Sequence, residues 1–390
     1  MKLLVVSFPC VTAVNQSFFA DLEEQTGWTV TLAMPNRWKT EYGPIEGCAR
    51  WPAFRGKIDC EPVIFPGDIP KHVYRGWLLR TLRRERPDAI YMHHEPYGFA
   101  TFQLYLANRL TVNKPIGFYA AQNLLKTYPT PVRQLERWVL RQSSFAFPVT
   151  NVAADILRKK HYEGRVEVLP LAVSPELYRP TPEWSCEWRE RNGIPSGRVI
   201  FGYMGRFVEE KGLRTLCDAL ERLGDLDWGL VLVGGGPLEA ELRGKAAAMG
   251  ERGKRIRFAG YVPHDEAPKW LSLFNVMVLP SETRPNWMEQ FGRVLVEAMA
   301  CGTPVIGSDS GEIPKILTET GGGIVFPEGN ASALAEAMLQ LGKSSELRCE
   351  FAEKGRASVL VTYDQKHLAR RFAEVIESAV QGTKASSQSI

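Results

Sequence analysis

Short apolar runs alternate with longer amphipathic stretches along most of this 390-residue chain. The short runs are rich in Val, Ile, Leu and aromatic residues, which predicts buried strands, whereas apolar positions at helical spacing predict helices. Because the two kinds of stretch alternate, the sequence predicts an α/β fold with parallel sheets. In the first half, strands are expected at 3–7, 29–33, 89–92, 115–120, 145–149 and 166–169, and helices at 15–25 and 73–84.

A second series of the same kind follows a proline-rich interruption. Residues 179–183 read Arg-Pro-Thr-Pro-Glu, which is typical of a linker. The strands expected beyond it are 199–204, 229–233, 256–259, 276–279 and 305–307. The pattern predicts two α/β domains, residues 1–178 and 179–362, followed by a last helix over 363–380.

Composition excludes some classes of protein without indicating a function. The chain is 44% hydrophobic and 24% charged, which is ordinary for a globular protein. No apolar run reaches the ~18 to 20 residues that a membrane span needs, and the first apolar stretch is too short for a signal peptide. We therefore expect a cytoplasmic protein. Seven scattered cysteines without a C-x-x-C spacing favour reduced thiols over a zinc site or a disulfide framework.

Charge is shared unevenly between the two halves. Residues 1–170 hold 22 Lys and Arg against 15 Asp and Glu, whereas residues 171–390 hold 26 against 29. The first half should prefer an anionic membrane surface, a phosphorylated acceptor or nucleic acid, unless it is a solvated face without a partner. Residues 71–86 hold six Lys and Arg beside leucines, which predicts a basic amphipathic helix. Such a helix either lies on an anionic membrane or covers the following strand.

The clearest candidate chemistry follows the strand expected at 199–204. Residues 205–212 read Gly-Arg-Phe-Val-Glu-Glu-Lys-Gly, which places Arg206 and Lys211 just before a helix. In an open parallel sheet the carboxyl end of a strand is where ligands bind, and two cations there would suit a diphosphate. The alternative is that the two cations pair with Glu209 and Glu210 at the surface.

Two further stretches follow later strands. Residues 233–237, Val-Gly-Gly-Gly-Pro, form a glycine turn that either admits a ligand or relieves crowding. Glu289 is expected at the start of a helix and Glu297 eight residues later, about 80° around and 12 Å along its axis. Apolar residues flank Glu297, so its carboxylate needs a hydrogen-bonding partner, for which a ribose diol is one candidate.

Together with residues 258–262 and 297–306, these stretches resemble the C-terminal domain of retaining family-4 glycosyltransferases of the GT-B fold. The resemblance covers about residues 199–330. It implies two Rossmann-like domains whose parallel sheets face a central cleft, with the last helix returning to the N-terminal domain. It also implies a hexosyltransferase that moves a sugar, with retention, from a UDP- or GDP-linked donor to a hydroxyl of a glycan, lipid-linked or small-molecule acceptor.

The resemblance also assigns roles to residues. Arg206 and Lys211 hold the donor diphosphate, and Glu289 contacts the donor sugar, so these three form the catalytic set. The donor-binding set is Gly205, Gly235, Tyr261, Phe291, Gly292, Val294, Leu295 and Glu297, the last of which binds the ribose hydroxyls. Because the two cations replace a metal as the counter-charge, we expect no metal and no other cofactor. The pair Asp225 and Asp227 falls at the opposite end of a strand.

On the acceptor side the candidates are His94, Gln122 and Asn15. His94 follows a strand within a His-Glu-Pro stretch similar to that at the cleft of related transferases, unless the backbone simply satisfies its ring. Gln122 stands where many relatives have a histidine that contacts the transferring sugar, and glutamine cannot act as an acid or base. Asn15 lies in a first turn, residues 8–16, that lacks the glycines of many relatives and of dinucleotide-binding dehydrogenases.

Two other functions remain open. A nucleotide-sugar epimerase of the same fold would release a changed sugar-nucleotide without an acceptor. A nucleic-acid-binding module is the less favoured alternative, because the aromatic residues are not interleaved with Lys and Arg. For a lipid-linked acceptor, the enzyme would work at the inner face of a membrane.

Overall fold

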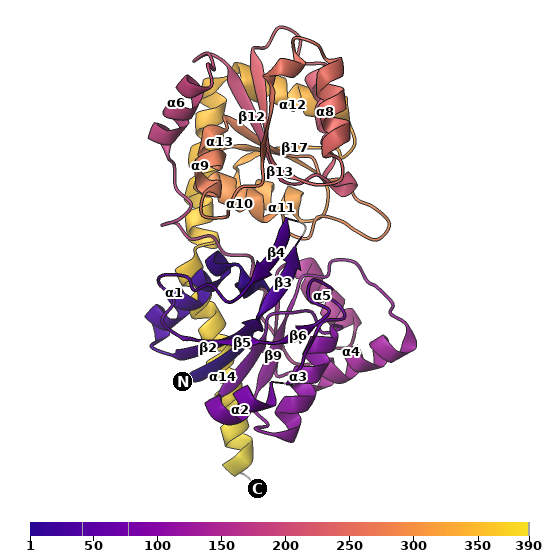
Figure 1. Ribbon diagram of the computed structural model, residues 1–390, viewed down its shortest axis with the longest axis vertical. Helices are drawn as coiled ribbons and strands as arrows, with labels where there is room; N and C mark the ends of the chain where they lie inside the picture. Colours follow the sequence, from indigo (N-terminus) through magenta and orange to yellow (C-terminus); the bar gives the residue numbers. More distant parts are fainter. Residues whose placement is uncertain (41, 77, 389–390) are drawn as a thin grey trace. The chain divides into compact units, whose positions relative to one another are not determined.

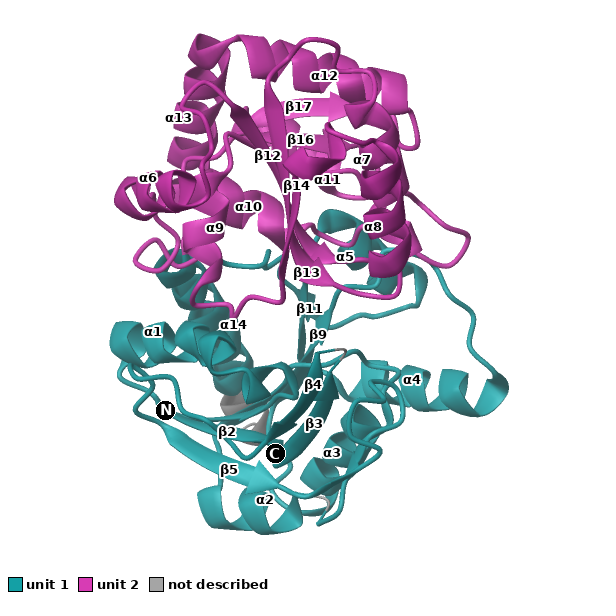
Figure 2. Ribbon diagram, turned by 45° about the horizontal axis from the view of Figure 1, so that its top comes forward, with its two compact units in different colours: residues 1–172, 365–390 teal, residues 173–364 magenta. Residues whose placement is uncertain are grey.

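The computed structural model describes residues 1–40, 42–76 and 78–388 of the chain. The chain divides into two compact units (Figure 2). Unit 1 comprises Met1–Ala172 and Gln365–Ile390, and unit 2 comprises Val173–Asp364. The chain therefore changes unit at 172/173 and 364/365, whereas the sequence predicts changes at 178/179 and 362/363.

Unit 1 is built on a seven-stranded parallel sheet (Figure 1). In order across the sheet, its strands are β11 (Arg165–Val166), β10 (Phe145–Pro148), β9 (Ile116–Ala120), β8 (Ala89–Met92), β1 (Lys2–Val6), β2 (Thr29–Pro35) and β5 (Lys57–Glu61). Its helices are α1 (Ser17–Thr26), α2 (Leu79–Glu85), α3 (Phe99–Leu110), α4 (Thr130–Gln142), α5 (Asn151–Lys159) and α14 (Gln365–Gln388). Two small antiparallel pairs, β3 (Arg37–Thr40) with β4 (Gly43–Glu46) and β6 (Val63–Ile64) with β7 (Val73–Tyr74), complete it.

Helices cover both faces of the unit 1 sheet, which explains its apolar strands. Along β1, Leu3 and Val5 belong to one buried cluster, and Leu4 and Val6 belong to the other. Successive side chains of a strand point to opposite faces, so a run without polar residues requires cover on both sides. The chain's last helix supplies part of that cover, because the Phe372 ring of α14 stacks on Phe147 of β10 at 4.6 Å between centroids.

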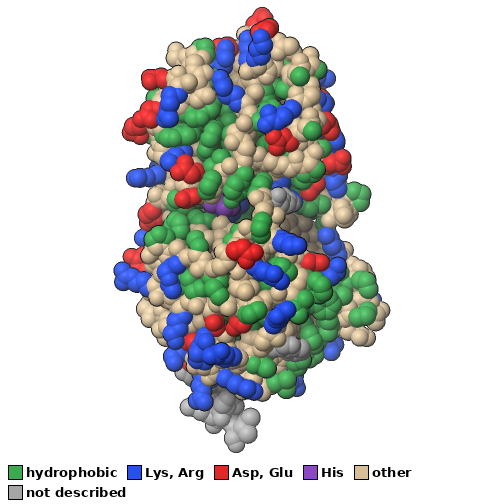
Figure 3. Space-filling view, in the orientation of Figure 1, with side chains coloured by type: hydrophobic (Ala, Val, Ile, Leu, Met, Phe, Trp, Pro, Cys, Tyr) green, Lys and Arg blue, Asp and Glu red, His purple; other side chains and the backbone are tan. Residues whose placement is uncertain are grey.

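The basic segment at 71–86 does not form the predicted amphipathic helix. Among its described residues only those of α2 are helical, whereas Val73–Tyr74 pairs with Val63–Ile64 as a short strand. The backbone of buried Tyr74 makes two hydrogen bonds with the amide of Gln103, which fixes an extended conformation. Leu78 and Leu82 pack into the core, as in the strand-covering alternative. Trp77 lies outside the described residues. Figure 3 shows Lys and Arg side chains gathered over unit 1 near α2.

The cysteine prediction is wrong for one pair, because Cys48 and Cys60 form a disulfide. Parallel pairing of β2 with β5 sets Cys60 beside Met34, and the β3–β4 hairpin brings the chain back to Asn36, whose carbonyl accepts from the Gly47 amide. This tertiary pairing, rather than any sequence spacing, brings the two sulfurs together. Cys10, Cys217 and Cys301 are buried thiols, while Cys186 and Cys349 are exposed.

Unit 2 has a six-stranded parallel sheet, also flanked by helices (Figure 1). In order, its strands are β14 (Ile256–Gly260), β13 (Trp228–Gly235), β12 (Val199–Arg206), β15 (Val276–Leu279), β16 (Val305–Ser308) and β17 (Gly323–Phe326). Its helices are α6 (Pro182–Arg191), α7 (Leu213–Leu220), α8 (Glu239–Ala248), α9 (Ala267–Leu273), α10 (Arg293–Ala300), α11 (Ile313–Thr320), α12 (Ala331–Lys343) and α13 (Ser345–Thr362). Within the described ranges, no helix combines the length and apolar character needed to cross a bilayer.

Candidate active site

The predicted donor-binding residues follow neighbouring strands at the carboxyl edge of the unit 2 sheet. β12 ends at Arg206, and β13 ends at Gly235, which lies opposite Arg206 in the parallel register. Tyr261 directly follows β14 and is exposed. A Cβ at Gly234 would lie 1.9 Å from the carbonyl oxygen of Gly205. Glycine is therefore required there by contact between the two strands, whether or not a ligand also approaches.

Lys211 and Glu289 form a close ion pair across this edge. Lys211 ends the 3₁₀ turn Glu209–Lys211, and its Nζ lies 2.5 Å from Oε2 of Glu289. The Ser281 hydroxyl donates to the same oxygen at 2.7 Å. The Lys211 ammonium also lies 5.1 Å from the ring centroid of Trp287. Only 15% of the Lys211 side chain and 8% of the Glu289 side chain are exposed, so a cation and a carboxylate are held together in a largely desolvated place.

The other predicted cation, Arg206, is more exposed. Its guanidinium lies 3.6 Å from a carboxylate oxygen of Glu210, one turn further along the chain. Arg206 thus pairs with a neighbouring glutamate, as in the alternative given above. Lys211 does not, because its partner Glu289 is 78 residues away in sequence. Glu209 pairs with Arg214 at 3.2 Å. The two cations therefore differ, since one sits in a solvated pair and the other in a buried one.

Glu289 does not begin a helix, so the predicted placement of the two glutamates on one helix is wrong. α10 starts only at Arg293, after Gly292 in a left-handed conformation (φ 75°). Glu289 is fixed by the chain that follows β16. Its amide donates to the Ser310 hydroxyl, and its carbonyl accepts from the Glu312 amide. Its side-chain direction is thus set by contacts with residues 310–312 and not by helical periodicity.

Glu297 lies in α10 and is nearly buried, with 9% of its side chain exposed. Arg293, one turn earlier, brings its Nε to 2.9 Å from Oε1 of Glu297. Tyr178 is close by, and its own burial together with the Glu297 carboxylate raises the pKa of Tyr178 well above its usual range. The predicted need of Glu297 for a partner is met in part by Arg293, because a buried carboxylate is costly unless it is paired.

Four residues of the predicted donor-binding set, Phe291, Gly292, Val294 and Leu295, lie around the start of α10. Phe291 is buried, and its ring packs 5.9 Å from that of Tyr363, so only its backbone can meet a ligand. The Leu295 amide donates to the Gly292 carbonyl at 2.8 Å and is engaged within the turn. Val294 is half-buried. These residues surround the amino end of α10, an eight-residue helix whose dipole favours an anion at that end.

Two of the three acceptor-side candidates are engaged with the protein itself. The His94 ring contacts the Thr101 hydroxyl at 2.9 Å through Nδ1 and the Ile69 carbonyl at 3.1 Å through Nε2. Burial, together with neighbouring histidines, lowers the pKa of His94 to about 3. Asn15 donates from Nδ2 to the Pro9 carbonyl at 2.8 Å. These contacts favour a structural role for both residues.

Gln122, which follows β9, has a different environment. Its Oε1 accepts from Lys160 Nζ at 2.8 Å, and the same ammonium donates to Glu136 at 2.6 Å. Its buried Nε2 has the Tyr128 hydroxyl as its polar neighbour but makes no hydrogen bond of good geometry among the described residues. The Gln122 side chain is almost fully buried. A buried donor without an acceptor is costly, so this amide is suited to a ligand oxygen.

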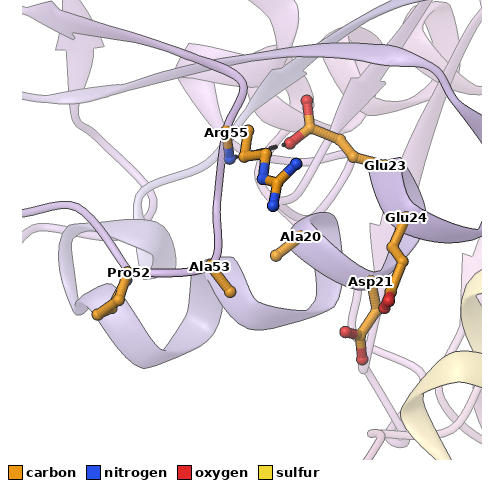
Figure 4. A pocket seen from close by; sticks show the side chains of 7 residues that line it. All are labelled: Ala20, Asp21, Glu23, Glu24, Pro52, Ala53 and Arg55. Atoms are coloured by element: carbon orange, nitrogen blue, oxygen red, sulfur yellow. Dashed lines mark hydrogen bonds between the residues drawn. The ribbon is translucent and has the colours of Figure 1, made fainter.

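A hollow of about 390 Å³ in unit 1 contains none of the predicted residues (Figure 4). It is lined by Ala20, Asp21, Glu23, Glu24, Pro52, Ala53 and Arg55. The Glu23 carboxylate accepts from the amides of Val30, Arg55 and Gly56. Because these bonds tie α1 to the loop before β5, the carboxylate has a structural use.

The Asp225 and Asp227 pair lies where the sequence predicts it, before β13 at the amino edge. Asp227 accepts from Arg198 at 2.8 Å and lies 3.5 Å from Arg255. Both contacts lie where β12 and β13 begin, next to the paired residues Val199 and Trp228. In the part of the chain that the structure describes, no three His, Cys, Asp or Glu side chains cluster as metal ligands.

Comparison with known proteins identifies the family. Residues 185–358 match the family described as glycosyl transferases group 1. The chain is 28% identical over 295 residues to the alpha-D-kanosaminyltransferase of Streptomyces kanamyceticus, covering 71% of this chain and 74% of that one. It is 30% identical over 288 residues to the 2-deoxystreptamine N-acetyl-D-glucosaminyltransferase of Streptomyces fradiae, covering 67% and 66%. The chain belongs to the group 1 glycosyltransferases.

Solved structures confirm the predicted GT-B fold of this group 1 glycosyltransferase. Anabaena Alr3699/HepE, solved in complex with UDP, has a TM-score of 0.74 at 17% identity, over 97% of this chain and all of that one. A glycosyltransferase from Rickettsia africae has a TM-score of 0.76 at 16% identity, over 97% and 98%. At such identities the likeness shows the fold alone, here two units with parallel sheets.

Sequence reasoning missed several polar residues of this group 1 glycosyltransferase. Ser281 could have been found, because it lies just after the strand expected at 276–279. Glu95 is half-buried after β8, and its desolvation raises its pKa to about 7 while its Oε1 accepts from the Ala121 amide. Lys160 and Glu136 come from helices whose sequence carries no motif, so only the fold brings them to Gln122.

Proposed function

We propose that this chain is a retaining family-4 hexosyltransferase that moves a sugar from a nucleoside-diphosphate sugar to a hydroxyl. The observation that carries the proposal is the Lys211–Glu289 pair at the carboxyl edge of the unit 2 sheet. Relatives support either of two donor bases. Anabaena Alr3699/HepE was solved with UDP-glucose, and a Mycobacterium tuberculosis mannosyltransferase, 31% identical over 215 residues, is named as GDP-mannose-dependent.

The two cations would stabilise the leaving diphosphate. An ammonium has three donors, and Lys211 uses one on Glu289, so others can meet diphosphate oxygens. Arg206 has a solvated partner that a diphosphate could displace. As the bond to the sugar breaks, negative charge grows on the diphosphate. Fixed cations at that place, with the amino end of α10, lower the barrier without reorganising.

The two glutamates would hold the two sugars of the donor. Ser281 and Lys211 fix the Glu289 carboxylate, which is then oriented to accept from hydroxyls of the transferring sugar. Glu297 is fixed by Arg293 and can accept from ribose hydroxyls as well, since a carboxylate offers about four lone-pair positions. Gly205, Gly235, Tyr261 and the backbone of residues 291–295 would complete the donor site.

We propose no metal and no other cofactor, because Arg206 and Lys211 supply the counter-charge that a divalent cation would otherwise give. Activity should therefore persist in excess EDTA. Loss of activity with EDTA and its return with magnesium would contradict this part of the proposal.

The acceptor is proposed to be a hydroxyl of a glycan, lipid-linked or small molecule, approached through unit 1. Gln122 is the residue we propose to contact the transferring sugar, because its Nε2 faces only the Tyr128 hydroxyl, without good hydrogen-bond geometry, and could turn to a sugar oxygen. His94 and Asn15 would support the surrounding loops. For a lipid-linked acceptor, the surplus of Lys and Arg in unit 1 would favour peripheral contact with an anionic membrane.

A two-step experiment tests the function. First, thermal shift against UDP-, GDP- and ADP-sugars identifies the donor, because a ligand that binds the native state raises its melting temperature. Second, the chosen donor is incubated with and without candidate acceptors, and released UDP or GDP is measured. Release that depends on an acceptor supports transfer, whereas conversion of the donor to another free sugar-nucleotide identifies the epimerase alternative.

A further inference from the structure

A second hollow in unit 1, of about 210 Å³, is strongly basic. It lies among the loop after β9, α4 and the end of α5. It is lined by Leu125, Lys126, Thr127, Tyr128, Arg133, Glu136, Arg137, Leu140, Lys159, Lys160 and His161. Five Lys and Arg side chains and His161 thus surround the hollow, and its lining includes one carboxylate, that of Glu136.

Most of these cations lack a counter-ion. Lys160 pairs with Glu136, and only 10% and 5% of the two side chains are exposed. No described carboxylate lies within ion-pair distance of Lys126, Arg133, Arg137 or Lys159. Arg133 also has a buried Nε without a hydrogen-bond partner in the described ranges. Like charges gathered around a concavity are unfavourable without an anion, and a buried guanidinium donor without an acceptor is costly as well.

Lys160 connects this hollow with the strand end where Gln122 lies. Its ammonium donates to both Glu136 and Gln122, and it lies 5.2 Å from the ring centroid of Tyr128. The Tyr128 ring in turn lies 4.8 Å from that of Tyr97. A ligand in the hollow would therefore meet cations and an aromatic surface close to the Gln122 side chain, which Lys160 contacts directly.

We propose that this hollow binds a phosphate or diphosphate group carried by the acceptor, an inference that rests on the proposed function. Phosphate oxygens accept several charge-assisted hydrogen bonds at once, and the planar guanidinium of Arg133 can give two in parallel. Lys160 neutralises Glu136, so that carboxylate does not oppose the anion. The concave shape and the buried Arg133 donor favour one bound phosphate group over a flat layer of lipid headgroups.

A third hollow provides a matched control. It encloses about 460 Å³ and is lined by Arg83, Arg86, Leu110, Thr111, Val112 and Lys114. Arg86 and Lys114 lie just before β8 and β9, at the amino edge of the sheet and away from Gln122. Removing two cations there changes the net charge of unit 1 as much as removing two from the phosphate site does.

The test uses the full chain, saturated with whichever of UDP or GDP the thermal shift identifies so that the donor site is filled, and titrates inorganic pyrophosphate by calorimetry. The double variant Lys126→Gln/Arg133→Gln should bind pyrophosphate ~10-fold more weakly or worse, whereas Arg83→Gln/Lys114→Gln should change affinity less than ~2-fold. Arg133→Lys should lie between them, because it keeps the charge and loses the paired donors. Equal losses in the two double variants, or none, would overturn the proposal.

Two further measurements distinguish a phosphate site from a membrane contact and from a folding defect. Vesicles containing phosphatidylglycerol are tested for co-sedimentation with the same variants, and binding that depends on Lys126 and Arg133 while pyrophosphate does not bind would identify a membrane contact instead. Melting temperatures establish that each variant is folded. If neither UDP nor GDP binds the unsubstituted chain, the proposed function fails, while the comparison of the two double variants still decides the phosphate site.

Discussion

The carboxyl edges of the two sheets use their charged residues in different ways. At the edge of unit 2, Lys211 and Glu289 come from separate segments and meet in a buried pair. At the edge of unit 1, His94 is engaged on both ring nitrogens, and Lys160 stands between Gln122 and Glu136. The edge of unit 2 thus holds opposite charges that a charged ligand could redistribute, whereas His94, Gln122 and Lys160 at the edge of unit 1 are engaged mainly with other groups of the protein.

This difference between the two edges matches the distribution of motifs along the sequence. Motif residues at the unit 2 edge are proposed to bind a common ligand, the sugar-diphosphate. The unit 1 edge carries no such motif, and Gln122 there meets Glu136 of α4 only through Lys160, which follows α5. A donor site shared within a family and an acceptor site particular to the chain would produce this contrast.

The largest effect is expected for Lys211→Met, which keeps the length of the side chain and removes its charge. The variant loses a cation from the leaving diphosphate and leaves Glu289 buried without its ion pair. We expect kcat/KM to fall ~10²- to 10³-fold, as for loss of one oxyanion donor. Steady-state kinetics with the identified donor measures it. Lys245→Met is the control, because Lys245 pairs with Asp218 at the surface. A kcat/KM within twofold of the unsubstituted enzyme would remove Lys211 from the site.

The next effect concerns stability in unit 1. Burial raises the pKa of Glu95 from 4.5 to about 7, against the opposing influence of the Ala121 amide and of Lys160. The native state therefore binds the extra proton between these values, and the free energy of unfolding falls as pH rises through that window. Glu95→Gln has no such proton, so its free energy of unfolding should exceed that of the unsubstituted chain by ~3 kcal/mol near pH 8 and by nothing near pH 4.

Urea unfolding at several pH values measures that difference. Glu241→Gln, at the exposed surface of α8, serves as the control and should show no gain at high pH. A gain for Glu95→Gln that grew toward low pH would have the wrong sign. In that case the Glu95 carboxylate would be stabilised as a charge, and Lys160 would outweigh burial.

A smaller effect is expected for Glu297→Gln in unit 2. The amide keeps the shape of the carboxylate but weakens the contact with Arg293 and with ribose hydroxyls. A hydrogen bond to a charged group is worth ~1.5 to 3 kcal/mol, so the donor KM should rise roughly ten- to a hundredfold while kcat changes little. Glu312→Gln is a matched control, because Glu312 is equally buried and pairs with Lys315 at 3.1 Å. A fall in kcat at unchanged KM would place Glu297 at the reacting sugar instead.

Regular elements and the unit 2 edge were largely predictable from the sequence. Apolar runs such as those at 3–7 and 276–279 gave strands of the two parallel sheets. The strand expected at 199–204 extends to Arg206, and Lys211 follows it. Such features are local, because a buried strand must be apolar on both faces and its end must present polar residues. The GT-B fold followed from the motifs and their order.

What the sequence did not predict depends on contacts between distant segments. Residues 73–84 have helical spacing, yet Gln103 holds Tyr74 in an extended conformation. Glu289 was expected on a helix, but residues 310–312 hold it in a loop. The Cys48–Cys60 bond follows from the pairing of β2 with β5. In each case a hydrogen bond or a strand pairing between distant segments decides the structure. The local sequence pattern does not predict such a contact.

The smallest effect on activity is expected for His94→Gln. Both ring nitrogens contact protein groups, and the pKa of His94, lowered to about 3, keeps the ring neutral at ordinary pH. A glutamine can replace one of the two contacts, so kcat/KM should stay within ~3-fold while the loss of the other contact lowers stability by ~1 to 2 kcal/mol. Kinetics and urea unfolding of the same preparation measure both. A ~100-fold fall in kcat with unchanged stability would make His94 a catalytic residue, and the unit 1 edge would then hold reacting groups as the unit 2 edge is proposed to do.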